Sequence, residues 1–293
     1  MAVYKRTYKA YTGALTPEWS RFLVLSRFSF ATLFDSRLFT AFTVLCFVPF
    51  LIGFAFIYIS HSLTVQLILG INTLQAHPIA IDGAWFVTYL AVQSWLGFFL
   101  TAWCAPGLIA QDLANNALPL YLSRPLSRPE YLLGKITVLA TLLSCITWVP
   151  ALILFLLQAE MEGHGWGWDN ISIAGAIFAS AWLFIALIAL VSTALSIWMK
   201  WRIAATAAML AVFFVAPGFG LAIDQVLRVQ WGRLLNLPFD VMLIWFHMFH
   251  AEDRFRASGL IPVWEAWATI FMVCWLAILL LNKRLRAKEV IRG

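Results

Sequence analysis

The sequence predicts an all-α membrane protein with six transmembrane helices, an N-terminal amphipathic interfacial helix, and an outer re-entrant or interfacial segment before the last span. The first observation behind this class is composition. Of the 293 residues, 62% are hydrophobic and 12% are charged, and the mean hydropathy is +0.86. Soluble domains carry about 25% charged residues, because water must wet their surface. The composition therefore excludes a soluble globular enzyme and a disordered chain.

The second observation is the distribution of the charged residues. Six stretches lack them and are long enough, or nearly so, to cross a bilayer as a helix, which takes about 20 residues. They are residues 38–59, 84–109, 136–159, 170–199, 203–223 and 266–282. The run that begins at residue 38 stays free of charge as far as residue 81. Its second half carries His61, Gln66 and His77, which indicates an excursion on the outer surface rather than another crossing.

The Lys and Arg residues orient these spans. Sixteen of the 20 lie before the first span or after the second, fourth or sixth span. The positive-inside rule places those segments in the cytoplasm. We therefore expect residues 1–37 to form a cytoplasmic N-terminus, residues 38–283 the six-span domain and residues 284–293 a basic cytoplasmic tail. The expected location is the inner, or cytoplasmic, membrane, with both termini cytoplasmic.

The N-terminal segment carries a helix-start signal, because Thr16 can cap a helix and Pro17 suits its first position. At about 100° per residue, six apolar side chains share one arc, away from the charged Arg21 and Arg27. They are Trp19, Phe22, Leu23, Phe30, Leu33 and Phe34. The pattern predicts an amphipathic helix at the cytoplasmic interface, which serves either as a positional anchor or as an elbow that moves.

The cytoplasmic loop between the second and third spans, residues 111–130, is the most informative part of the sequence. Ser123-Arg124-Pro125 is followed at once by Ser127-Arg128-Pro129, and each proline biases the residue before it away from helix. Ser127 and Glu130 have the spacing of a capping box, which starts the helix of the third span. A loop that only orients the chain is one interpretation. The stiffness of this turn favours the other, a mechanical contact.

This loop resembles that of the membrane permeases of ABC-2 type exporters. Asp112 lies at the inner end of the second span, and residues 122–130, followed by Gly134-Lys135, are similar to the family's LLSRPISRREILLGK pattern. The likeness covers most of residues 16–285. It implies a homodimer in the membrane that works with ATP-binding subunits contacting the loop after the second span. The residues that would form this coupling surface are Asp112, Leu122, Ser123, Arg124, Pro125, Ser127, Arg128 and Glu130.

Two absences in the sequence agree with a partner ATPase. No Gly-x-x-x-x-Gly-Lys-Ser/Thr phosphate loop occurs, so ATP and Mg are expected on the partner and no cofactor in this chain. No Asp, Glu, Lys or Arg falls inside a predicted span, whereas proton- and sodium-driven carriers usually need such groups. Membrane lipid is the remaining expected partner. Nucleic acid is not expected, because the basic residues follow membrane topology.

Other functions have less support from the residues. An intramembrane enzyme is not expected, since no His-Glu-x-x-His motif or recognisable Ser–His dyad occurs. The main alternative is a non-transporting membrane subunit that scaffolds, or transmits ATPase-driven force to an outer partner. The outer segment, residues 224–265, would be its docking surface.

The outer segment also contains a weak candidate for a metal site. Residues 241–251 lie between two acidic residues and are too few to cross a membrane, which favours a re-entrant or surface-lying helix. His247, Met248 and His250, with Asp253 after them, have a spacing that could suit copper or zinc. Histidines in an aromatic belt are the simpler interpretation, and no metal is predicted.

Overall fold

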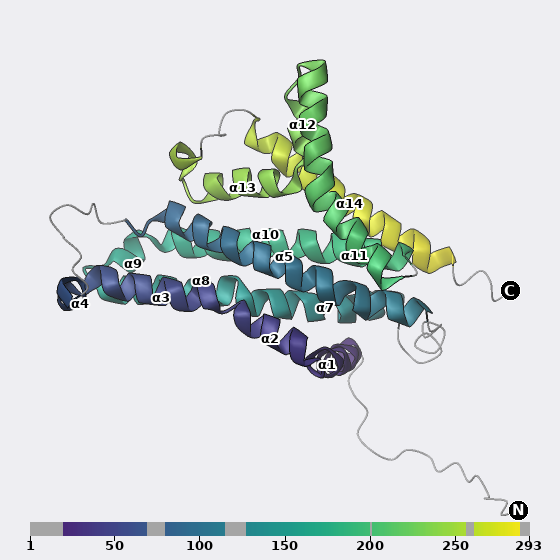
Figure 1. Cartoon of the computed structure of the whole chain (residues 1–293), viewed down its shortest axis with the longest axis horizontal. Coiled ribbons are helices and arrows are strands. Elements are labelled where there is room, and N and C mark those ends of the chain that lie inside the picture. Colours follow the sequence, from purple (N-terminus) through teal and green to yellow (C-terminus); the bar gives the residue numbers. More distant parts are fainter. Residues whose placement is uncertain (1–19, 69–79, 115–126, 200, 256–260, 288–293) are drawn as a thin grey trace, which may run out of the picture.

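The computed structural model describes residues 20–68, 80–114, 127–199, 201–255 and 261–287, and every regular element in these ranges is a helix (Figure 1). The longer helices are α1 (Arg21–Phe34), α2 (Arg37–Leu45), α3 (Val48–His61), α5 (Gly83–Ala114), α7 (Arg128–Ile146), α8 (Trp148–Glu162), α10 (Ile171–Trp198), α11 (Arg202–Leu210), α12 (Ala216–Leu227), α13 (Leu237–Met248) and α14 (Val263–Ala287). The short ones are α4 (Leu63–Ile68), α9 (Trp166–Asp169), the π-helix η2 (Ala211–Val215), and the 3-10 helices η3 (Trp231–Leu235) and η4 (Glu252–Arg254). The predicted all-α class is confirmed.

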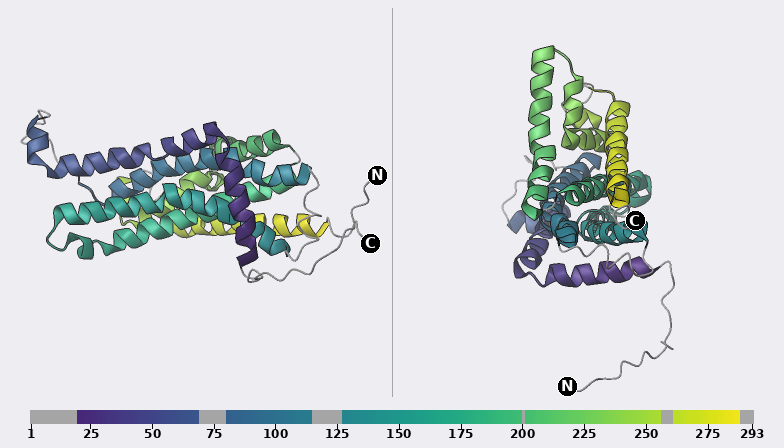
Figure 2. Two further views of the ribbon diagram at one scale, coloured as in Figure 1. Left: turned by 90° about the horizontal axis from the view of Figure 1, so that it is seen from below. Right: turned by 90° about the vertical axis from the view of Figure 1, so that its right-hand side faces the viewer.

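Six helical stretches in the described part of the chain are long and apolar enough to cross a membrane, as predicted. They are Arg37–His61, Gly83–Ala110, Pro129–Glu162, Ile171–Trp198, Arg202–Leu227 and Val263–Arg284. The third begins several residues earlier than its charge-free run, because the helix starts at the Ser127 cap and continues through Lys135. The chain is therefore a multi-pass membrane protein, with α1 lying across one end of the bundle (Figure 2). The Thr16-Pro17 start signal of α1 lies outside the described residues.

Three of the spans are interrupted, each just before a proline. The first breaks between α2 and α3 ahead of Pro49, the third breaks at Thr147 ahead of Pro150, and the fifth contains η2 ahead of Pro217. A proline has no backbone N–H and its ring clashes with the carbonyl four residues earlier. Each break therefore leaves carbonyl groups without their helical partner, which is costly where lipid replaces water.

Side chains of neighbouring helices bond to carbonyls that the prolines release. Pro150 cannot donate to the carbonyl of Ile146, and Gln93 Nε2 of α5 donates to that oxygen at 2.6 Å. Pro106, inside α5, releases the carbonyl of Ala102, to which Thr206 Oγ1 of α11 donates at 3.2 Å. These bonds tie α5 to α7 on one side and to α11 on the other.

Replacing Gln93 by leucine is expected to destabilise the chain by about 1–2 kcal/mol, because the buried Ile146 carbonyl loses its donor. Restoring a backbone N–H with Pro150→Ala should remove most of that cost. The measurement is the unfolding midpoint of both single variants and the double variant in detergent. Equal costs of Gln93→Leu with and without Pro150 would show that the released carbonyl is not what Gln93 stabilises.

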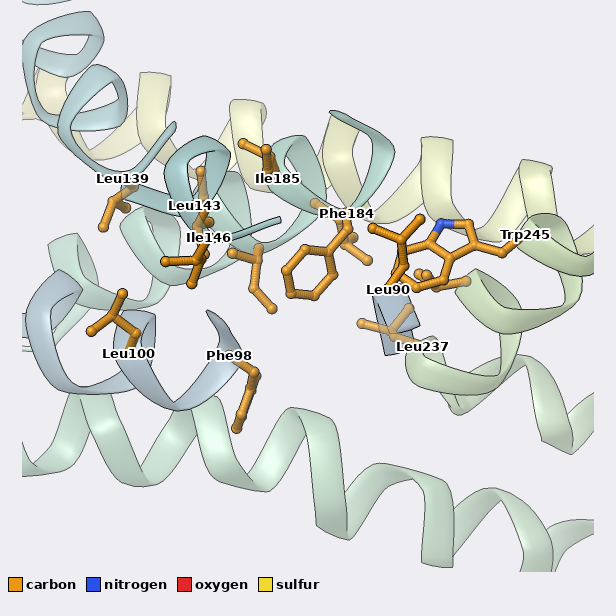
Figure 3. Close-up of a cluster of buried hydrophobic side chains, with 14 of the residues drawn as sticks. Leu90, Phe98, Leu100, Leu139, Leu143, Ile146, Phe184, Ile185, Leu237 and Trp245 are labelled. Carbon is orange, nitrogen blue, oxygen red and sulfur yellow. The ribbon is translucent and has the colours of Figure 1, made fainter. Parts of the chain in front are cut away.

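The core joins side chains of α5, α7, α10 and α13 (Figure 3). The labelled members are Leu90, Phe98 and Leu100 of α5; Leu139, Leu143 and Ile146 of α7; Phe184 and Ile185 of α10; and Leu237 and Trp245 of α13. Trp245 is fully buried and its indole N–H donates to the carbonyl of Ser180 at 3.1 Å. This bond fixes α13 against α10.

The outer segment forms the buried helix α13, held between α10 and α14 and also touching α5. Asn236 caps this helix by accepting the backbone N–H of Phe239, and Pro238 occupies its first turn. The outer segment predicted to be re-entrant or interfacial thus contains a helix that packs into the bundle. The preceding helix, α12, projects away from the bundle (Figures 1 and 2).

Candidate functional site at the junction of α1, α5 and α7

A polar cluster joins three helices at the end of the bundle where α5 ends and α7 begins. Asp112, in the last turn of α5, accepts a hydrogen bond from the Tyr131 hydroxyl at 2.9 Å and pairs with Lys135 Nζ at 2.9 Å. Tyr131 and Lys135 lie one turn apart on α7, and both are buried. The ammonium group also lies 5.8 Å from the centre of the Tyr131 ring. Asp112 is thus largely buried, with its charge neutralised locally.

The amphipathic helix α1 packs on this cluster through small polar residues. Ser26 Oγ donates to the carbonyl of Gly134 at 2.8 Å, and Lys135 Nζ donates to Ser29 Oγ at 3.4 Å. A methyl group at Gly134 would lie 3.0 Å from the carbonyl oxygen of Phe22 and 3.1 Å from Leu25. The absence of a side chain at Gly134 therefore lets α1 approach the backbone of α7.

The face of α1 that meets α7 lies partly outside the predicted apolar arc. Leu25, Ser26 and Ser29 are buried there, whereas Leu23 and Phe34, members of the predicted apolar arc, are more than 40% exposed. Periodicity of apolar residues locates the side of a helix that avoids water. Periodicity does not reveal that Gly134 and Lys135 of α7 contact α1 through the small hydroxyl side chains of Ser26 and Ser29.

The capping box at the start of α7 is confirmed. The Ser127 backbone N–H and hydroxyl both donate to Glu130 Oε2, at 2.6 and 2.8 Å. Glu130 therefore has a structural task in addition to the contact predicted for it. The box fixes the first turn of α7 and so the positions of Tyr131 and Lys135.

The other predicted coupling residues fall outside this description. Leu122, Ser123, Arg124 and Pro125 lie outside the described residues, and so does the side chain of Arg128. Of the predicted set, the structure brings Asp112 together with α7 and pairs Ser127 with Glu130. Sequence reasoning missed Tyr131, Lys135, Ser26 and Ser29. The i, i+4 spacing of Tyr131 and Lys135 and the i, i+3 spacing of the serines were the available signals.

The three weak metal candidates have different surroundings. His247 Nδ1 pairs with the carboxylate of Glu252, while Met248 Sδ accepts a hydrogen bond from Ser180 Oγ of α10 at 3.5 Å. His250 has a φ of +52° and ends α13: its N–H bonds to the carbonyl of His247, and that of Ala251 to Phe246. Among the described residues, no three His, Cys, Asp or Glu side chains are grouped so as to hold a metal ion.

No protein-family model matches the sequence, and no curated protein matches it either.

Proposed function

We propose that the chain is the membrane subunit of an ATP-driven exporter of the ABC-2 type. In this proposal two copies form the translocation pathway, and each binds a separate ATP-hydrolysing subunit at residues 111–130. Three features support it: the six-span all-helical architecture, the likeness of residues 122–130 to the family's loop, and the absence of a phosphate loop from this sequence.

The observation that carries the proposal is the polar cluster beside that loop. Residues 115–126 connect the end of α5 to the start of α7, and both ends of this connection are anchored by Asp112, Tyr131 and Lys135. Lys135 and Gly134 also contact α1. A force applied to the loop would reach the second span, the third span and the amphipathic helix together, as coupling to an ATPase requires.

The proposal fixes an orientation. The ends of α5 and α14, the start of α7, and α1 gather at one end of the bundle (Figure 1). We assign this end to the cytoplasm, because the excess of Lys and Arg is predicted there. The opposite end, with α4, α9 and η4, would then face outward, and the membrane would be the inner, or cytoplasmic, one.

The test is affinity purification of the tagged chain from its native membrane in mild detergent. We expect an ATP-binding subunit near one-to-one with the wild type. Charge reversal of Arg124 and Arg128 to glutamate should lower its recovery by about tenfold, since surface charge contacts at an interface govern binding steeply. Arg228→Glu is the matched control, because Arg228 is exposed at the end of α12.

Three outcomes would count against the proposal or part of it. Recovery of no ATP-binding protein, under conditions in which the chain still purifies as a dimer, would remove the energy source. Equal recovery with the Arg124 and Arg128 variants would remove the coupling surface but leave the partnership. An ATPase that is recovered while reconstituted vesicles export nothing would favour the force-transmitting subunit instead.

A further inference from the structure

An aspartic acid lies inside the helical bundle without a partner among the described residues. Asp240, in the first turns of α13, has no exposed surface, and neither carboxylate oxygen has a hydrogen-bond partner in the described part of the chain. Leaving a buried charge unpaired costs far more than protonating the group. The geometry therefore calls for a neutral carboxyl at this position.

No described cation on the elements around α13 pairs with Asp240. No Asp, Glu, Lys, Arg or His occurs in α10 or in residues 83–110 of α5. Among the described side chains, the titratable groups on elements that contact α13 are Tyr89, Cys104 and Asp112 of α5, Glu265, Cys274, Lys283 and Arg284 of α14, Arg233 of η3, and Glu252, Asp253 and Arg254 of η4; His247 lies on α13 itself. The cation nearest in sequence, Arg233, pairs with Asp224 at 3.4 Å, and Arg254 pairs with Asp82 at 3.1 Å.

We infer that Asp240 is a proton-binding site, whose carboxyl holds a proton while α13 is packed between α5, α10 and α14 and releases it to water when α13 separates from them. The O–H bond of the carboxyl breaks in that step and the proton passes to solvent. A metal or alkali cation fits less well, because such ions take several oxygen ligands and a lone carboxylate supplies two.

The energetics agree with this geometry. Burial raises the pKa of Asp240 to about 8, because desolvation penalises the charged form. A small cavity of about 60 Å³ lies beside the same helix, between α5, α10, η2 and α13, and Val241, Met242 and Trp245 help to line it. Separation of α13 exposes the carboxyl to water and returns its pKa toward 3.9.

The sign of the pH dependence follows. The packed state binds the proton more tightly, so packing is favoured at low pH and loses stability as the pH rises toward 8. Between pH 6 and pH 8 the equilibrium constant for separation of α13 should rise about tenfold per pH unit, and above pH 8 it should level off.

Hydrogen–deuterium exchange of residues 237–248 in lipid nanodiscs tests this, with the whole chain and no ATP. The readout is the ratio of opening constants in the wild type and in Asp240→Asn at residues other than 240 and 241, where both chains share the same intrinsic exchange rates. We expect this ratio to rise about tenfold per pH unit from pH 6 to 8. Glu265→Gln, the control on α14, should behave as the wild type does.

A ratio that stays flat with pH would overturn the inference, as would loss of the rise in Glu265→Gln. Infrared spectroscopy of the wild type with isotope-labelled aspartate gives a second readout that requires no variant. The band of a protonated carboxyl should be present at pH 7 and fall about tenfold by pH 9. An ionised Asp240 at pH 7 would also overturn the inference. Neither measurement involves an ATPase, so its failure is separate from failure of the proposed function.

Discussion

Replacing Lys135 by methionine is expected to destabilise the chain by about 3 kcal/mol, because the Asp112 carboxylate then stays largely buried with no cation beside it. Lys135 is 4% exposed and the Asp112 side chain is 18% exposed, so water replaces the lost cation only in part. Methionine keeps the length and apolar stem of the side chain, which confines the change to the charge. The measurement is the unfolding midpoint of the purified chain in detergent or nanodiscs.

The double variant Asp112→Asn with Lys135→Met separates the ion pair from simple packing. It removes both charges while the Tyr131 hydroxyl can still donate to the amide oxygen, so roughly half or more of the lost stability should return. Lys283→Met, in the last turns of α14, is the control and should change little, since Lys283 is exposed. A double variant as unstable as Lys135→Met alone would show that the lysine acts through its contacts with α1 and not through Asp112.

Gly220→Ala is expected to separate α12 from η3, at a cost of about 3 kcal/mol or more. The added methyl carbon would lie 2.2 Å from the carbonyl oxygen of Gly232. The methyl carbon is attached directly to the backbone and the oxygen is part of it, so neither can rotate away. Gly232→Ala should be equally harmful, because its methyl carbon would lie 2.5 Å from the carbonyl oxygen of Gly220 and 2.5 Å from Asp224 Oδ1. Thermal unfolding and protease sensitivity of the purified variants measure the effect.

Gly218→Ala is the matched control for this contact. Gly218 lies on the same helix two residues earlier, and nothing stands within 4 Å of a methyl group there. Because alanine favours a helix over glycine by about 1 kcal/mol, this variant should be neutral or more stable. If Gly220→Ala behaved as Gly218→Ala does, the close approach of α12 and η3 would be wrong, and so would the hydrogen bond at 2.7 Å from the Gly232 N–H to Asp224.

The candidate site could be predicted only in part from the sequence. Asp112 and the Ser127–Glu130 cap were found because a span end and a Ser-x-x-Glu spacing are local signals. The partners of Asp112 were not found, because Tyr131 and Lys135 meet it across a connection of more than a dozen residues. Ser26 and Ser29 approach from still farther away, and their hydroxyl groups look equally suited to water.

The burial of Asp240 also could not be predicted from the sequence. No charged residue was expected among the buried parts of the helices, since Asp240 stands at the edge of a short apolar stretch that could equally well have lain on the surface. Packing of α13 between α10 and α14 turns this residue into a fully buried carboxyl. Its changed chemistry arises entirely from that packing.

Composition and the spacing of charges by themselves determined the all-α membrane class, the six spans and the start of α7, because each depends on the solvent around the chain or on bonds within a few residues. The tertiary structure alone decided which groups lie beside one another. Carbonyl groups released by prolines, such as that of Ile146, accept hydrogen bonds from other helices. Helix α1 packs where Gly134 leaves room, and α13 is buried together with Asp240. These contacts join residues distant in sequence, and a periodic pattern carries no information about its partner.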